Sequence, residues 1–124
     1  SNEWHVQHLI EPRSVVPESV MPSYGFLADR PLDVRGFATH LVANARVGVP
    51  YTDEMIAEAE ADMRAQADRD ADTAGLLERY PKARTGDFDG DPAALTEMDA
   101  LVAYLQMLGT LVDFSTYDEA AGYR

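Results

Sequence analysis

The sequence has no cysteine among its 124 residues. Disulfide bonds, thiolate metal sites and thiol catalysis are therefore excluded within the chain, and so is any cofactor attachment through a cysteine sulfur. Long apolar runs are also missing: the uninterrupted apolar stretches are only a few residues long, whereas a membrane-spanning helix needs about 20. No signal-peptide pattern opens the sequence. We expect the chain as given to be soluble.

Basic residues are scarce: ten lysines and arginines stand against 22 aspartates and glutamates, a formal net charge of −12. This balance argues against nucleic-acid binding, which needs clustered Lys and Arg to neutralise phosphates. Residues 1–51 hold five acidic and four basic residues, and residues 52–124 hold the other 17 and six. The acidic second part predicts either a solvated surface or an attraction for a basic partner.

The composition, 46% hydrophobic and 26% charged, is typical of one globular domain. Apolar spacing predicts an all-α fold. We expect helices over about residues 3–10, 33–46, 52–78 and 97–108. Their expected N-caps include Asn2, Thr52 and Thr96.

The last helix is the best defined. Asp99 follows Thr96 by three residues, as the acidic partner in a capping box does, and Gly109 ends the pattern. Between them five apolar residues recur at helical spacing, namely Ala100, Leu101, Tyr104, Leu105 and Leu108. This pattern predicts a core helix.

Residues 64–74 are almost wholly alanine and charged residues, with little to bury. We interpret about residues 64–92 as an acidic, solvent-projecting insertion. The domain is expected to cover residues 1–113, followed by a polar tail over residues 114–124.

Three prolines punctuate residues 11–24: Pro12, Pro17 and Pro22. Pro12 is expected to end the first helix, and the rest is expected to be an ordered, stiff loop. Met21 lies in this loop. A thioether presented on a stiff loop suits a soft metal such as haem iron, where Met opposite His raises the reduction potential. Spacing alone favours the alternative, in which Met21 fills a gap in the core.

Three stretches carry a family resemblance. The first is Glu3-Trp4-His5-x-x-His8-Leu9-x-x-Pro12-Arg13-x-Val15-Val16-Pro17-Glu18-Ser19-x-Met21-Pro22-x-Tyr24. The second is Val47-Gly48-Val49-Pro50-Tyr51-Thr52, and the third runs from Glu97 to Thr110. Together they resemble the mono-haem cytochrome c subunit (subunit II) of cbb3-type cytochrome c oxidases, and they span most of the chain.

The resemblance implies a cytochrome c-like fold that relays electrons toward the catalytic haem–copper subunit. It implies that Met21 is the distal haem ligand and that haem c is held covalently in the full-length protein by a Cys-x-x-Cys-His segment upstream of this chain. Its partners would be the catalytic and di-haem subunits, on the periplasmic side of the bacterial inner membrane, with a membrane anchor upstream. Without the attachment motif and the N-terminal helix, the chain is expected to be apo and to self-associate as a homodimer.

Four further residues are candidates for cofactor contact. In the context of the resemblance, Arg13 suits a haem propionate because its guanidinium is a planar fork; a surface arginine bonding loop carbonyls is equally expected. Tyr24 and Trp4 could line the haem site, or they could only pack against other side chains of the protein. The second interpretation is favoured. Pro22 stiffens the loop beside Met21.

Other metal patterns are weaker. His5 and His8 are three residues apart but no third ligand is evident, and His40 stands alone. Asp87, Asp89 and Asp91 alternate as at the start of a calcium loop, with Glu97 downstream. The glycine falls at the fourth rather than the sixth position, so a solvated acidic turn is the better expectation.

Two other functions stay open beside electron transfer. One is a helical interaction module whose acidic residues 52–92 bind a basic partner, with Met21 only in the core. The other is a calcium-binding regulatory domain built on residues 87–97. No serine, lysine or carboxylate pair suggests nucleophilic or acid–base catalysis, so the chain itself is not expected to be an enzyme.

Overall fold

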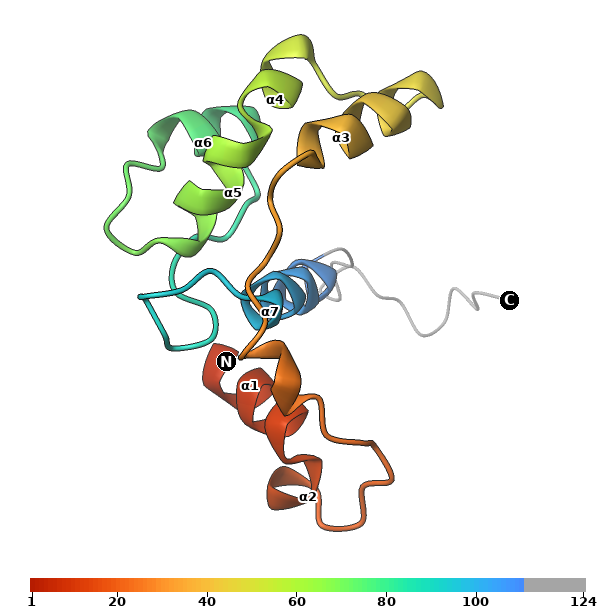
Figure 1. Cartoon of the computed structure of the whole chain (residues 1–124), viewed down its shortest axis with the longest axis vertical. Coiled ribbons are helices and arrows are strands. Elements are labelled where there is room, and N and C mark those ends of the chain that lie inside the picture. Colours follow the sequence, from red (N-terminus) through yellow and green to blue (C-terminus); the bar gives the residue numbers. More distant parts are fainter. Residues whose placement is uncertain (111–124) are drawn as a thin grey trace, which may run out of the picture.

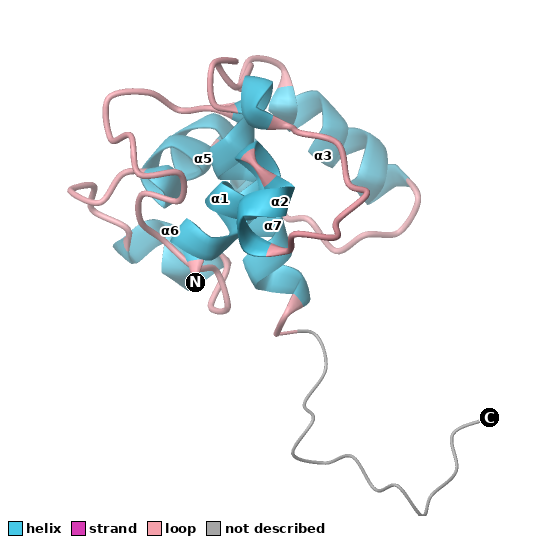
Figure 2. Cartoon of the chain, turned by 90° about the horizontal axis from the view of Figure 1, so that it is seen from below, coloured by secondary structure: helices cyan, strands magenta, loops and turns pink. Residues whose placement is uncertain are grey.

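The computed structural model describes residues 1–110, which form helices joined by loops (Figures 1 and 2). The expectation of an all-α fold is confirmed: the described part has no strand, only an isolated antiparallel bridge between Pro31 and Thr96. The helices are α1 (Asn2–Ile10), α2 (Pro12–Val15), the 3-10 helix η1 (Gly25–Leu27), α3 (Phe37–Arg46), α4 (Asp53–Ala57), α5 (Ala59–Ala67), α6 (Ala74–Arg79) and α7 (Glu97–Leu108). None of them is long and apolar enough to cross a membrane.

The first helix begins one residue earlier than expected. The hydroxyl of Ser1, not the side chain of Asn2, caps it by accepting a hydrogen bond from the Trp4 amide. The prediction of Asn2 as the cap is therefore wrong. Asn2 is a helical residue whose amide group reaches α7, since its Oδ1 accepts from Gln106 Nε2 at 2.7 Å.

The proline-rich stretch after α1 is not wholly a loop. Glu11 ends α1, and Pro12 is the first residue of the short helix α2. Proline is favoured there because its missing N–H would be unpaired in any first helical turn. The stiff loop expected over residues 11–24 thus begins only after Val15 (Figure 1).

The second predicted helix starts at Phe37 rather than Asp33. Gly36 precedes it with φ 74°, in the left-handed region that glycine adopts without strain. Upstream, the Asp33 carboxylate accepts a hydrogen bond from the Arg35 amide at 3.0 Å. A side chain that bonds its own backbone two residues on stabilises a turn in place of a helix.

The helix predicted over residues 52–78 is three helices, α4, α5 and α6. Thr52 caps α4 as predicted, accepting from the Met55 amide at 3.2 Å. The largest break follows α5, where the Asp68 and Asp72 carboxylates accept hydrogen bonds from the amides of Asp70 and Ala74. These local bonds compete with the helical ladder.

An arginine joins the three short helices. Arg79 of α6 donates from Nε to Asp62 of α5 at 2.8 Å and from Nη1 to Glu54 of α4 at 3.1 Å. Asp62 is buried, and both neighbours raise the pKa of the Arg79 guanidinium, Asp62 most strongly. Arg79 therefore stays charged and holds the helices together.

The core lies where the first and last helices meet. Leu9 of α1 packs with Phe88, Met98 and Val102, the last two from α7. Thr96 and Asp99 form the predicted capping box and Gly109 is the C-cap, so the predicted limits of this helix are confirmed.

The buried face of α7 differs from the predicted one. Met98 and Val102 are fully buried, whereas Tyr104 is 52% and Leu108 41% exposed. Leu101 and Leu105 are partly buried against the core. The helix is therefore turned so that the predicted stripe lies at the border of the core.

Two side chains of the segment interpreted as a solvent-projecting insertion, residues 64–92, are buried in the structure. Leu76 is 4% exposed and Phe88 3% exposed, and Phe88 belongs to the core cluster. The exposed residues of the segment are spread along it and include 68–70, 77–78, 81–82, 84–85 and 90–92. Residues 111–124, which include the predicted polar tail, lie outside the described part.

Candidate functional site

The loop that carries Met21 connects α2 to η1. On its N-terminal side the loop is held by hydrogen bonds to α2 and within itself. Arg13 Nε of α2 donates to the Ser19 carbonyl at 3.1 Å, and Ser19 Oγ accepts from the Met21 amide at 3.2 Å. On the other side it is tied to α1. Ser23 Oγ donates to the Ile10 carbonyl at 2.6 Å and the Tyr24 amide donates to the Leu9 carbonyl at 2.8 Å. The loop is thus ordered by hydrogen bonds as well as by its prolines.

Met21 lies at the edge of the core. Its side chain is partly buried and packs against the cluster of Leu9, Phe88, Met98 and Val102. This packing agrees with the alternative in which Met21 fills core space. The side chain is only partly buried, however, so the core does not fully enclose it.

The other predicted contact residues are not all brought together. Pro22 is exposed beside Met21, and the ring of Tyr24 lies 6.2 Å from that of Phe26. Arg13 bonds a loop carbonyl, as in the alternative expectation for this residue. Trp4 is 45% exposed on α1. The structure therefore places Met21, Pro22, Tyr24 and Arg13 on or next to one loop and Trp4 on the adjoining helix.

The two histidines of α1 surround Trp4. Its ring lies 5.3 Å from the His5 ring and 4.7 Å from the His8 ring. Partial burial is the main cause that lowers the pKa of His5, which favours its neutral form. No cluster of three metal-ligating side chains among residues 1–110 includes either histidine.

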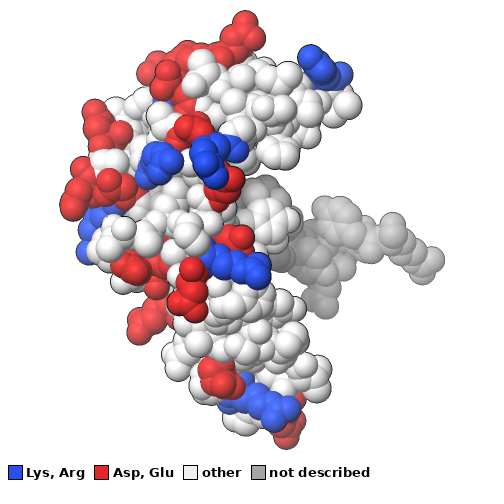
Figure 3. Space-filling view, viewed as in Figure 1, with Lys and Arg blue, Asp and Glu red and all other residues white. Residues whose placement is uncertain are grey.

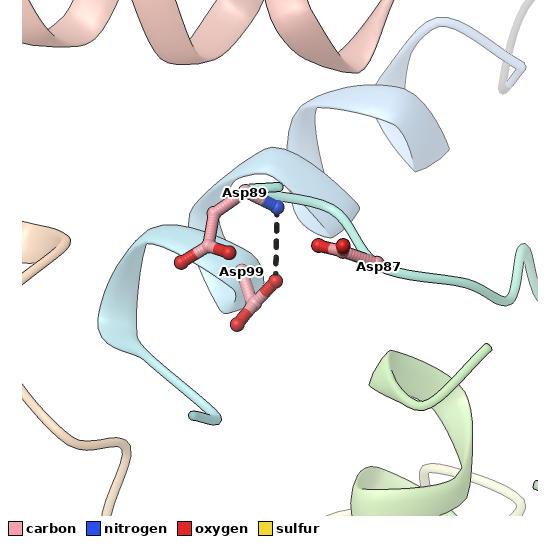
Figure 4. A group of neighbouring side chains, drawn as sticks. All are labelled: Asp87, Asp89 and Asp99. Carbon is pink, nitrogen blue, oxygen red and sulfur yellow. Dashed lines mark hydrogen bonds between the residues drawn. The ribbon is translucent and has the colours of Figure 1, made fainter. Parts of the chain in front are cut away.

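The acidic loop before α7 is organised differently from a calcium loop, which was the weaker alternative to a solvated acidic turn. Asp87, Asp89 and Asp99 each offer an oxygen within 4.8 Å of the others (Figure 4). Two of the four predicted ligands are elsewhere: the Asp91 carboxylate accepts from the Ala93 amide, and Glu97 pairs with Arg30. The predicted set of Asp87, Asp89, Asp91 and Glu97 is therefore not assembled.

Asp99 is the organising residue of this loop, and sequence reasoning identified only its capping role. Its carboxylate accepts hydrogen bonds from the amides of Phe88 at 3.2 Å and Thr96 at 3.0 Å. It also accepts from the Asp89 amide at 3.0 Å (Figure 4). Its oxygens are thus already occupied by donors of the chain. The capping box predicts the Thr96 bond, but no local pattern predicts the bonds to residues 88 and 89.

One depression of the described surface lies apart from Met21, which is not among its lining residues. It has a volume of about 680 Å³ and lies between α1 and the loop at residues 87–90. Its charged lining consists of four carboxylates and one guanidinium, from Glu3, Glu11, Asp87, Asp89 and Arg69. Such a lining repels the propionates of a haem, so this depression does not compete with the Met21 loop as a haem site.

Comparison with known families agrees with these observations. No curated protein matches the chain. A family model described as cytochrome C oxidase, mono-heme subunit/FixO matches residues 1–112, which is nearly the whole chain and includes the Met21 loop, the acidic loop and α7. The chain therefore belongs to the family of mono-haem cytochrome c oxidase subunits, a family that takes part in electron transfer.

Proposed function

We propose that this chain is the haem-contacting part of an electron-transfer subunit in a cbb3-type oxidase, with Met21 as an axial ligand of the haem iron. The observation that supports this is the Met21 loop itself: a soft sulfur donor on a loop held by hydrogen bonds on both sides. Electrons would pass from the haem of this subunit to the catalytic haem–copper subunit. The di-haem subunit would be a further partner, on the periplasmic side of the membrane.

The residues present fit one axial position of a haem. A thioether is the donor type found opposite histidine in cytochromes c, and a haem c so ligated supplies a one-electron couple of raised potential. Apolar side chains that remain exposed along the same stretch, Val20 at 96% and Phe26 at 46%, suit contact with a macrocycle. Because the chain has no cysteine, the thioether links would come from residues outside these 124.

The roles of the chain's own residues then follow from their positions. Met21 would bind the haem iron, Pro22 and the hydrogen bonds of the loop would orient its side chain, and Tyr24 and Trp4 would exclude water as walls of the haem site. Arg13 uses only its Nε in the loop, so the remaining donors of its guanidinium are left to pair with a propionate. None of these roles makes or breaks a covalent bond of a substrate.

The test is Met21→Leu in the complete haem-loaded subunit. Leucine keeps the volume and apolar character, so the free energy of unfolding should fall by at most about 1.5 kcal/mol. The iron loses its sulfur ligand, so its spin state should change and its reduction potential should drop. Absorption spectroscopy and redox titration measure both.

Met55→Leu and Met107→Leu are matched controls, since they make the same change on α4 and α7. Both should leave the spectrum and the potential as in the wild type. A wild-type spectrum in Met21→Leu, together with an altered one in a control, would show that the ligand is assigned to the wrong residue.

The alternative function is a helical interaction module that does not contact haem. Its support is the distribution of charge: carboxylates gather on the side of α4, α5 and α6, whereas the part that holds α1 and α2 carries few (Figure 3). A basic partner would bind there by electrostatic attraction. Because such a module would not depend on a sulfur ligand, the Met21→Leu experiment separates the two functions.

A further inference from the structure

The two sets of hydrogen bonds around the Met21 loop suggest a role in positioning the ligand that is separate from any contact with the haem. On the basis of the proposed function, we propose that Ser19 and Arg13 are positioning residues for Met21. They fix the backbone on the N-terminal side of the ligand, and so set how firmly its sulfur stays on the iron.

The N-terminal anchor consists of one arginine and one serine. The Ser19 amide donates to the Val16 carbonyl at 2.9 Å, and the Ser19 carbonyl accepts from Arg13 Nε at 3.1 Å. The Ser19 hydroxyl accepts from the amide of Met21 at 3.2 Å. All three hydrogen-bonding groups of Ser19 are therefore used to shape the loop.

The C-terminal anchor is on α1. Ser23 Oγ donates to the Ile10 carbonyl and accepts from the Gly25 amide, and the Tyr24 amide donates to Leu9. Only residues 20–22 separate the two anchors. The ligand thus stands in the middle of a span too short to reorient while both anchors hold.

Packing does not replace the N-terminal anchor. Val20, which connects Ser19 to Met21, is 96% exposed, and Pro17 and Glu18 are also exposed. Hydrogen bonds therefore fix this side of the loop, and the bond from Arg13 is strengthened by the charge of its guanidinium. Loss of either bond gives residues 16–20 more conformations and lets Met21 leave the iron more readily.

The experiment measures displacement of Met21 by added imidazole in the complete haem-loaded subunit. Ser19→Ala removes the hydroxyl acceptor and Arg13→Gln removes the guanidinium. Because each variant loses about one net hydrogen bond that holds Met21 in place, its apparent affinity for imidazole should be about two- to tenfold higher than that of the wild type. The iron–sulfur charge-transfer band should weaken in parallel, and Ser19→Thr, which keeps the hydroxyl, should restore both values.

Matched controls are available on neighbouring elements. Ser14→Ala changes a serine of α2 whose hydroxyl bonds the Glu11 carbonyl rather than the loop. Arg46→Gln changes an exposed arginine at the end of α3. Both controls should bind imidazole as the wild type does.

Two kinds of failure can be told apart. If Met21→Leu abolishes the charge-transfer band while Ser19→Ala or Arg13→Gln binds imidazole like its control, the positioning role of that residue is refuted and the proposed function stands. If Met21→Leu leaves the band intact, the proposed function is refuted together with the inference.

Discussion

Asp99 shows how much one side chain can organise. It caps α7 through the Thr96 amide and holds the loop residues 88 and 89 by their amides. It also lies close to two other carboxylates, Asp87 and Asp89. Burial is the main cause that raises the pKa of the Asp99 carboxyl, and the charge of Asp89 acts in the same direction, while the amide donors oppose them.

We predict an unusual pH dependence from this residue. Because the folded-state pKa is raised, the native state holds the Asp99 proton more tightly than the unfolded chain does. The stabilising contribution is fully present below the ordinary Asp pKa of about 3.9 and is lost as pH rises through the raised value. The free energy of unfolding of the wild type, relative to Asp99→Asn, should therefore fall as pH increases over that range.

Urea denaturation at several pH values measures this difference. Asp99→Asn also changes the capping hydrogen bonds, which shifts its free energy of unfolding by a similar amount at every pH. The quantity to compare is therefore the slope of the free energy of unfolding against pH, not its absolute value. Asp91→Asn, in the exposed part of the same loop, should retain the wild-type slope. If the free energy of unfolding of the wild type rose with pH relative to that of Asp99→Asn, the prediction would be contradicted.

At the scale of elements, local signals predicted the helix starts at Thr52 and Thr96, while the starts of α1 and α3 and the long-range contacts were missed. Thr52 and Thr96 could be predicted as caps because a cap depends on residues three positions away. The interruption of the helix expected over residues 52–78 was not predicted, because the alanines and arginines of the segment favour a helix and outweighed its aspartates, which do not. It is decided by two aspartate side chains and by Arg79 joining three separate helices.

The candidate site follows the same division. Met21 and its prolines stand out in the sequence, because a thioether flanked by prolines is recognisable locally. The contacts that hold the loop, from Arg13 to Ser19 and from Ser23 to Ile10, depend on how α1, α2 and the loop fold back on one another. No periodicity encodes them.

We predict that only part of the segment 64–92 contributes to the stability of the fold, namely the part that contains Phe88. Phe88→Ala should lower the free energy of unfolding by about 3–5 kcal/mol, because the ring is buried in the core cluster. Phe88→Leu should cost less than about 1.5 kcal/mol and still fold. Chemical denaturation followed by circular dichroism gives both values.

The control is the exposed turn between α5 and α6. Replacing residues 69–71 by a single glycine should change the free energy of unfolding by less than about 1 kcal/mol, because loop-length costs grow slowly. Loss of cooperative unfolding in this variant, with little effect of Phe88→Ala, would reverse our assignment of which part belongs to the core.

For the whole molecule, apolar side chains are exposed on α7, and the homodimer stays a prediction. Tyr104 is 52% exposed, and Met107 and Leu108 are each 41% exposed on the last turns of the helix. Residues three and four positions apart share a helix face. An apolar face of this kind favours association.

We therefore predict that the purified 124-residue chain forms dimers, and that Tyr104→Glu shifts it toward monomer at the same concentration by burying a charge at the contact. Light scattering with size-exclusion chromatography measures the mass. Val47→Glu is the control, since Val47 is 81% exposed after α3, and it should leave the mass unchanged. A wild-type chain that stays monomeric at high concentration would rule out the dimer.

The position of the core has a consequence for the order in which the chain folds. Leu9 packs with Met98 and Val102, so the contact that completes the core joins the first helix to the last across almost the whole described chain. Contacts of such long separation form slowly, because the loop between them must close first. During synthesis α1 emerges long before α7 exists. Its apolar side chains are therefore exposed to chaperones and to other nascent chains until α7 has been synthesised, while α4, α5 and α6 can join through Arg79 much earlier.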